Sequence, residues 1–257
     1  MARVFVTGSS TGLGLMAAQL LLESGHRVVL HGRDRRRADA ALAAAPASEA
    51  AVIGDLSKTE DLHAVAAQVN RLGEFDAVIH NAGVGYREAR RVETQDRLPV
   101  LFVTNTLAPY VLTALIGKPK RLVYLSSGMH RSARLNLEDL TWTRRSWRGA
   151  EAYAETKLHD VLIAFGVARR RPDVLSNALE PGWVATRMGG PSAPDDLDAA
   201  HRTQVWLAIS DDPAALVSGR YFYHRQPRQP NPIAEREDAQ DALIEACQHL
   251  SGVALPA

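Results

Sequence analysis

The chain has 257 residues, with 46% hydrophobic and 23% charged side chains, a composition typical of one folded globular domain. A formal net charge of +1 creates no overall field to attract nucleic acid, and the single cysteine, Cys247, excludes an intrachain disulfide. No apolar run approaches the roughly 20 residues that span a bilayer, so we expect a cytoplasmic protein that does not bind membranes.

Short apolar runs alternate along the chain with longer segments of helical spacing. Strands are expected at Val4–Val6, Arg27–Leu30, Ala51–Ile53, Ala77–His80, Arg121–Leu125 and Val174–Leu179. Helices are expected at Leu13–Ser24, Arg35–Ala45, Thr59–Arg71, Arg97–Leu115 and Ala150–Arg171. The alternation predicts an α/β fold in which one doubly wound parallel sheet carries helices on both faces.

Two segments interrupt this alternation. Residues 129–149 are rich in arginine and tryptophan and show no clear period, which predicts an excursion across the surface. Within residues 187–204, the sequence "GGPSAPDD" has the glycine and proline content of a mobile loop that leads into a helix. We expect both segments on the substrate side of a single domain, 1–257.

The first predicted strand is followed by the glycine-rich turn "TGSSTGLG". Gly8 permits a sharp turn, Gly12 lets the backbone approach a pyrophosphate, and Gly14 allows close helix packing. We expect a dinucleotide to bind along this turn, at Gly8, Ser10, Thr11, Gly12, Leu13 and Gly14. An ordinary tight turn between a strand and a helix is the alternative, because the dinucleotide motif G-x-G-x-x-G is absent.

Arg33 stands just after the second predicted strand. An acidic residue here would bind the ribose of NAD, whereas an arginine can pair with the 2′-phosphate of NADP. The sequence therefore favours NADP over NAD. A solvated, charged start to the next helix is the alternative, and it suits most of Arg35, Arg36 and Arg37.

Tyr153 and Lys157 are four residues apart on a predicted helix and should share one face. The lysine ammonium would favour the phenolate and lower the tyrosine pKa from about 10, which makes proton exchange feasible. Ser127, after the fifth strand, could donate a hydrogen bond to a substrate oxygen. Asn105 could hold a water that passes protons to the lysine. The histidines show no metal-ligand spacing, so no metal is predicted.

Taken in order, these residues resemble the short-chain dehydrogenase/reductase family over residues 3–223. The resemblance implies a Rossmann-like NAD(P)-binding domain and an oxidoreductase that acts on a carbonyl or alcohol. It assigns catalysis to Asn105, Ser127, Tyr153 and Lys157, with Tyr153 as general acid or base and Lys157 on the nicotinamide ribose. It also implies that the cofactor contacts Asp55, Leu56, Asn81, Ala82, Gly83, Pro181, Gly182, Val184 and Thr186.

The sequence departs from the family pattern in two places. His80 replaces the first asparagine of Asn-Asn-Ala-Gly, a change we expect to be tolerated. The long spacing between Ser127 and Tyr153 resembles the retinol-dehydrogenase-like branch, which implies a bulky apolar substrate. Trp183 is expected to flank the nicotinamide, whereas Trp142 and Trp147 could either line the pocket or pack onto the domain.

Alternatives remain open for function and assembly. A non-catalytic NADP-binding redox sensor or regulatory subunit has the same fold requirements. A nucleic-acid binder using "RDRRR" and "TRRSWRG" is disfavoured by the near-neutral charge. The resemblance implies a homodimer or homotetramer through the helices that flank the fifth strand, although the short segment 105–127 would also suit a monomer.

Overall fold

The computed structural model describes residues 1–256 and contains one mixed sheet in the order β3-β2-β1-β4-β5-β6-β7-β8. All neighbouring strands are parallel except β7 and β8. The strands are β1 (Arg3–Val6), β2 (Arg27–Gly32), β3 (Ala50–Ile53), β4 (Ala77–His80), β5 (Arg121–Leu125), β6 (Leu175–Glu180), β7 (Tyr221–Tyr223) and β8 (Gln226–Pro227). The predicted doubly wound, Rossmann-like α/β fold is confirmed.

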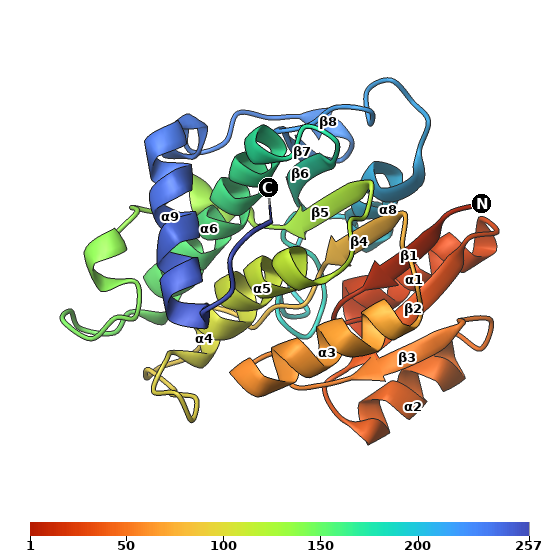
Figure 1. Ribbon diagram of the computed structural model, residues 1–257, viewed down its shortest axis with the longest axis horizontal. Helices are drawn as coiled ribbons and strands as arrows, with labels where there is room; N and C mark the ends of the chain where they lie inside the picture. The colour runs from red at the N-terminus through yellow and green to blue at the C-terminus, as the bar shows by residue number, and fades with distance from the viewer. Residues whose placement is uncertain (257) are drawn as a thin grey trace.

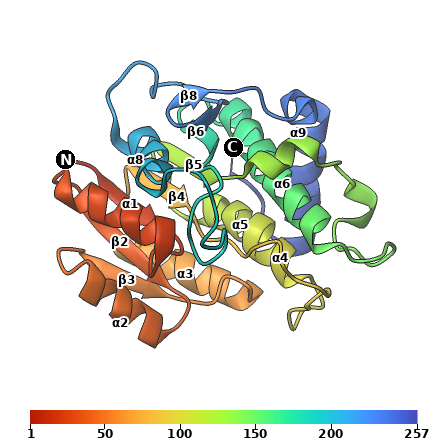
Figure 2. The same ribbon diagram turned by 180° about the vertical axis from the view of Figure 1, so that it is seen from behind.

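Helices cover both faces of this sheet (Figures 1 and 2). They are α1 (Gly12–Glu23), α2 (Arg35–Ala44), α3 (Thr59–Arg71), α4 (Val100–Phe102), α5 (Ala108–Leu115), α6 (Gly149–Arg170), α7 (Leu197–Ala200), α8 (Arg202–Ile209) and α9 (Glu237–Ser251). Short 3₁₀ turns lie at Gly128–Ser132, Leu137–Asp139 and Pro232–Glu235. Among residues 1–256, no helix is both long enough and apolar enough to cross a bilayer.

Alternate strand residues serve two hydrophobic cores, as the period of two requires. In β1, Phe5 packs with α3, α5 and α6, whereas Val4 and Val6 pack with α1, α2 and α8. Both faces of the sheet are therefore buried, which explains why its strands lack alternating polar residues.

The prediction of one regular helix at Arg97–Leu115 is wrong in two respects: the helix starts later, and it is not α-helical throughout. Arg97 has φ of 60° and the helix begins after Pro99, whose ring favours a first helical turn. Residues Val103–Leu107 then form a π-helical turn between α4 and α5. Such turns insert an extra residue and often occur at functional sites. Asn105 lies at the centre of this one.

The helices expected to form a dimer are covered by the chain itself. Helix α9 packs along α6 and also contacts α5, and the three lie side by side in Figures 1 and 2. Gly166 of α6 is required here, because a Cβ atom would stand 2.6 Å from Ile244 Cδ1 of α9. Asp241 of α9 pairs with Arg170 at 2.7 Å, and the Tyr110 hydroxyl of α5 donates to the Val253 carbonyl at 2.8 Å. The helix expected to follow the loop at 189–196 is present, since α7 begins at Leu197 and α8 at Arg202. The sequence does not predict α9, β7 or β8.

Candidate active site

The carboxyl ends of β1 to β6 meet at one edge of the sheet because these strands are parallel. The chain reverses its winding direction between β1 and β4, where open α/β sheets bind their ligands. The glycine-rich turn follows β1, residues Asn81–Gly83 follow β4, and Ser127 follows β5. The fold thus brings the predicted site residues to a common edge.

The glycine-rich turn has the shape that a pyrophosphate requires. Gly8 and Gly12 have φ of 62° and 59°, in the left-handed region that glycine favours. A Cβ on Gly8 would lie 2.8 Å from Ala82 Cα, whereas a Cβ on Gly12 would meet nothing within 4 Å. Thr11 precedes α1 without a capping hydrogen bond from its side chain. The amino end of α1 therefore presents its amides beside open space, which fits an anionic group.

Two side chains that sequence reasoning did not connect hold this turn. His31 Nδ1 accepts from the Gly8 amide at 3.0 Å, so its Nε2 carries the proton and donates to the Gly54 carbonyl at 2.9 Å. Burial lowers the pKa of His31 to about 4, so it stays neutral. Asn81 donates to the Thr7 carbonyl at 3.0 Å, and its buried Oδ1 has no hydrogen-bond partner within residues 1–256. That free acceptor at the cleft also fits a bound nucleotide.

The predicted adenine-end residues differ in their availability. Arg33 is largely exposed beside Asp34, with 3.6 Å between its Nε and the carboxylate. Asp55 accepts from the Ser57 amide and hydroxyl at 3.1 and 2.8 Å. The Leu56 side chain is buried in the large hydrophobic core. The Leu56 side chain is therefore committed to the core and is not available to a cofactor.

Tyr153 and Lys157 lie on one face of α6, as their spacing predicts. Lys157 Nζ is 5.9 Å from the centroid of the Tyr153 ring. The ammonium donates to the Leu125 carbonyl and to Asp160 Oδ2, both at 2.8 Å. Gly83 lies against both Lys157 and Asn105. A Cβ atom at Gly83 would be 3.6 Å from Lys157 Nζ and 3.4 Å from Asn105 Oδ1.

Burial changes the expected acidity of Tyr153. Removal from water raises the pKa of the Tyr153 phenol above its ordinary value, although the Lys157 ammonium and a hydrogen bond from Ser127 act to lower it. The predicted net lowering of this pKa is therefore wrong for the protein as it stands. Lys157 itself is favoured as a cation: burial lowers its pKa, but Asp160 and Tyr153 outweigh burial and raise it.

The two serines after β5 have different surroundings. The Ser127 hydroxyl accepts from the Met129 amide at 3.3 Å and acts to lower the pKa of the Tyr153 phenol. Ser126 donates to the Lys157 backbone carbonyl at 2.6 Å and is thereby committed to the fold. The next residue, Gly128, has no side chain, and a Cβ atom at this position would overlap Glu180 Oε2. Glu180 is fixed in turn by Arg131 at 2.5 Å and Arg228 at 3.3 Å.

The Asn105 side chain is fully engaged with protein groups. Its Oδ1 accepts from the Val84 amide at 2.8 Å, and its Nδ2 donates to the Val84 carbonyl and the Thr156 hydroxyl, both at 3.1 Å. Asn105 thus ties the loop after β4 to α6 one residue before Lys157. Oδ1 can accept one further hydrogen bond, and the role of Asn105 in holding a water stays a prediction.

The chain is similar in sequence and fold to known proteins. Residues 2–120 match the family model described as short chain dehydrogenase. The chain is 42% identical to an uncharacterized oxidoreductase of Emericella nidulans, across 100% of this chain and 99% of the relative. This chain belongs to the short-chain dehydrogenase/reductase family. Human retinol dehydrogenase 13 is 28% identical, across 98% of this chain and 85% of the relative. A crystal structure of an uncharacterized protein from Mycobacterium paratuberculosis superposes with a TM-score of 0.85 at 25% identity, covering 100% of this chain and 96% of that one.

In this short-chain dehydrogenase/reductase an apolar cluster surrounds the phenol. Tyr153 packs with Leu101, Trp142 and Ala152, and partly buried neighbours join them: Val84, Tyr86, Met129, Trp147 and Met188. The rings of Tyr86 and Tyr153 meet edge to face with centroids 5.6 Å apart. Any substrate that reaches Tyr153 must therefore contact apolar and aromatic side chains.

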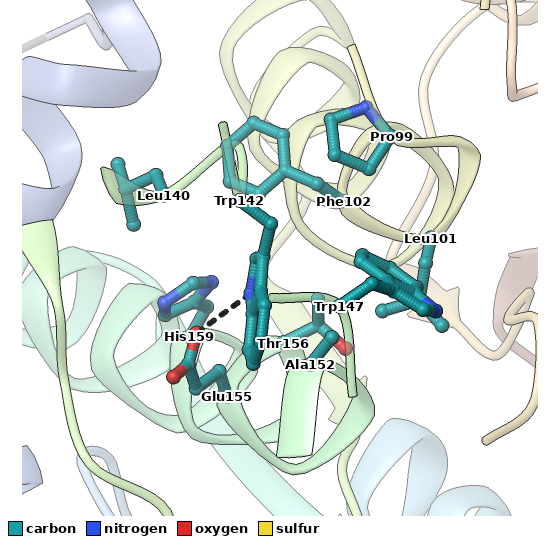
Figure 3. A pocket seen from close by; sticks show the side chains of 10 residues that line it. All are labelled: Pro99, Leu101, Phe102, Leu140, Trp142, Trp147, Ala152, Glu155, Thr156 and His159. Carbon is teal, nitrogen blue, oxygen red and sulfur yellow. Dashed lines mark hydrogen bonds between the residues drawn. The ribbon is translucent and has the colours of Figure 1, made fainter. Parts of the chain in front are cut away.

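Two of the tryptophans belong to this cluster, and they are the two that the sequence left open. Trp142 Nε1 donates to Glu155 at 3.1 Å (Figure 3). Arg145 lies 3.6 Å over the Trp142 ring and holds Glu155 at 2.5 Å. The space between Trp142, Trp147, Leu101 and the neighbouring side chains in Figure 3 is only about 10 Å³, room for about one water. Trp142 thus anchors the 129–149 excursion onto α6, whereas the half-buried Trp147 donates to the Glu88 carbonyl at 2.9 Å.

The loop after β6 lies against the catalytic face. The Met188 sulfur is 3.9 Å from the Tyr153 hydroxyl. Gly182 has φ of 87°, and Asp195 accepts from the Trp183 amide at 2.6 Å. Trp183 is 54% exposed and donates to the Gly189 carbonyl at 3.0 Å, so its indole stabilises the loop outside the Tyr153 cluster.

The remaining predicted cofactor residues of this loop are partly committed to it. Val184 is buried, and its carbonyl accepts from the Thr186 amide at 2.7 Å. The Thr186 hydroxyl accepts from the Gly189 amide at 3.2 Å. Pro181 and Gly182 continue β6 at the edge where Ser127 ends β5.

Proposed function

We propose that this protein is an NADP-dependent oxidoreductase that transfers a hydride between nicotinamide and a carbonyl or alcohol substrate. The observation that carries the proposal is the convergence of Tyr153, Lys157, Ser127 and Asn105 beside a glycine turn that leaves space for an anion. We further propose that residues 1–257 act as one domain, in the cytoplasm.

The chain's own residues have distinct tasks in this mechanism. The nicotinamide, when bound, would supply or accept the hydride. Tyr153 exchanges a proton with the substrate oxygen, and Ser127 donates a hydrogen bond to that oxygen as its negative charge grows. Lys157 places a positive charge next to the phenol, and the apolar neighbours of Tyr153 keep water from the reacting groups.

Substitution of Tyr153 tests the mechanism. Tyr153→Phe keeps the ring and its contact with Tyr86 but removes the proton, so turnover should fall at least about a thousandfold. NADPH affinity, measured by fluorescence titration, should stay within a factor of about three. NADPH consumption on a panel of carbonyl compounds provides the assay, and a fully active variant would refute the mechanism. If the wild type binds NADPH tightly and reduces nothing in a broad panel, the redox-sensor alternative becomes the better account.

The preference for NADP rests on Arg33. No acidic residue ends β2, and Arg33 extends from the strand end next to the glycine turn. Arg33→Ala should weaken NADPH binding at least about tenfold and leave NADH binding unchanged, because only NADPH carries the 2′-phosphate. Arg35→Ala is the matched control, since Arg35 is more exposed and lies near Asp39. Equal effects of both substitutions on NADPH and NADH would contradict this assignment.

We propose a bulky apolar substrate and a chain that does not dimerise through α5 and α6. Val84, Tyr86, Met129 and Met188 around Tyr153 support the first statement. The coverage of both helices by α9 supports the second. Light scattering of the purified protein tests the assembly, and a dimer that persists after substitution of exposed residues outside these helices would contradict it.

A further inference from the structure

The surroundings of the Lys157 ammonium include a carboxylate that the proposed chemistry has not used. Asp160 lies one turn along α6, and its Oδ2 accepts from Lys157 Nζ at 2.8 Å. The two side chains are only 6% and 4% exposed. With the Leu125 carbonyl also at 2.8 Å, two of the three ammonium hydrogens are committed between α6 and β5.

The stability of the fold does not by itself explain why a carboxylic acid, Asp160, occupies this buried position on α6. Taking an ion pair out of water costs about as much as the pair regains, and apolar residues often replace such pairs without loss. The following residues of α6, Val161, Leu162 and Ile163, are all fully buried and apolar. Asp160 is itself desolvated, and burial raises its pKa to about 6 despite the Lys157 charge. At a pH well above its pKa Asp160 is ionised and carries a negative charge beside Lys157.

We propose that Asp160 is a positioning residue for proton transfer: it fixes the Lys157 ammonium beside the phenol and makes the Tyr153–Lys157 pair keep its proton to higher pH. This inference rests on the proposed role of Tyr153. While Asp160 is ionised, the three groups together are neutral with the phenol protonated. Without that carboxylate they would carry +1, and a proton would leave more readily.

The other groups around the pair do not replace this charge. Tyr153 faces Lys157 on its own helix, the Ser127 hydroxyl after β5 and Tyr86 after β4. Asp160 also acts on Tyr124 of β5, which hydrogen-bonds with Thr113 at 2.7 Å. Arg171 at the end of α6 acts on Tyr124 as well. Asp160 is therefore the carboxylate that acts on both Lys157 and Tyr153.

Asp160→Asn tests the proposal, because the amide oxygen can still accept from Lys157 while the charge is gone. Tyrosinate absorbance is titrated above pH 7 without cofactor or substrate, and the same curve for Tyr153→Phe in each background is subtracted. We expect the acid dissociation constant of Tyr153 to rise roughly tenfold, one pKa unit. The ascending limb of the pH profile for alcohol oxidation, where the phenol loses its proton and becomes a base, should move to lower pH by the same amount.

Control variants separate this effect from a loss of structure. Glu155→Gln removes another buried, paired carboxylate of α6, and its amide oxygen can still accept from Trp142. The Tyr153 titration should therefore move far less in this variant than in Asp160→Asn. Asp160→Glu keeps the charge and should restore a titration near that of the wild type. If Asp160→Asn does not fold, Asp160→Ser makes the same charge change with a smaller side chain.

A Tyr153 titration that is unmoved or moves to higher pH in the neutral variants overturns the proposal. So does an equal shift in Glu155→Gln. Because the titration needs no turnover, it gives a result even if Tyr153→Phe proves fully active, so failure of the proposed function is recognised separately.

Discussion

Four of the five histidines that are buried among residues 1–256 should make this fold sensitive to mild acid. Burial lowers the pKa of His31 and His130 to about 4 and of His80 and His159 to about 3, whereas their ordinary value is 6.5. At pH 5 these four histidines are therefore protonated in the unfolded chain and mostly neutral in the folded chain. Stability rises with pH wherever the unfolded state binds more protons, so it must fall on acidification through this window.

The loss of stability at pH 5 is set by how far this pH lies below 6.5, the pKa of histidine in the unfolded chain. The folded-state pKa values do not limit it, since all four lie below 5. Each histidine contributes just under about 2 kcal/mol between pH 7 and pH 5, and the four together about 7 kcal/mol. Asp160, whose pKa is raised to about 6, gains a proton in the folded state and opposes this by about 1 kcal/mol. The net loss of about 6 kcal/mol is comparable with the whole stability of many domains.

His80→Asn isolates one of these contributions. His80 stacks on Tyr124 with ring centroids 4.8 Å apart, and its Nε2 hydrogen-bonds with Thr113 Oγ1 at 3.0 Å. Urea unfolding at pH 7 and pH 5, followed by tryptophan fluorescence, measures the free energy of unfolding. The difference between the two pH values should shrink by about 2 kcal/mol in His80→Asn. His63→Asn, at an exposed position, should leave it unchanged, and an undiminished difference in His80→Asn would refute the reasoning.

Two further predictions concern glycines whose missing side chain matters. Gly128→Ala should cost about 1–3 kcal/mol and reduce turnover at least about tenfold with NADPH affinity preserved, because Glu180 cannot yield and Ser127 must move. Gly117→Ala, where a Cβ would meet only Asn70 Oδ1 at 3.7 Å, is its control in steady-state kinetics and thermal unfolding. Gly166→Leu should displace α9 and also cost about 1–3 kcal/mol, measured by thermal unfolding together with light scattering. An unchanged melting temperature would show that α9 does not depend on this contact.

The sequence alone determined the features that local periodicity and strand order encode. Apolar runs and helical spacing predicted the first six strands within one or two residues, and a parallel sheet necessarily gathers the residues after each strand at one edge. The shared face of Tyr153 and Lys157 needed only the helical repeat. Strands β7 and β8 were not predicted because they have three and two residues, too few to show a period.

Tertiary structure decided the properties that depend on the groups packed against each residue. The acidity of Tyr153 depends on its apolar neighbours and on Asp160, and burial outweighs the lysine that the sequence places beside it. Trp142, not Trp183, joined the Tyr153 cluster because Glu155 and Arg145 hold its indole on α6. The coverage of α5 and α6 depends on a helix whose Asp241 lies 71 residues along the chain from its partner Arg170. Burial and charge pairing are sums over contacts between distant segments, and no local pattern contains those sums.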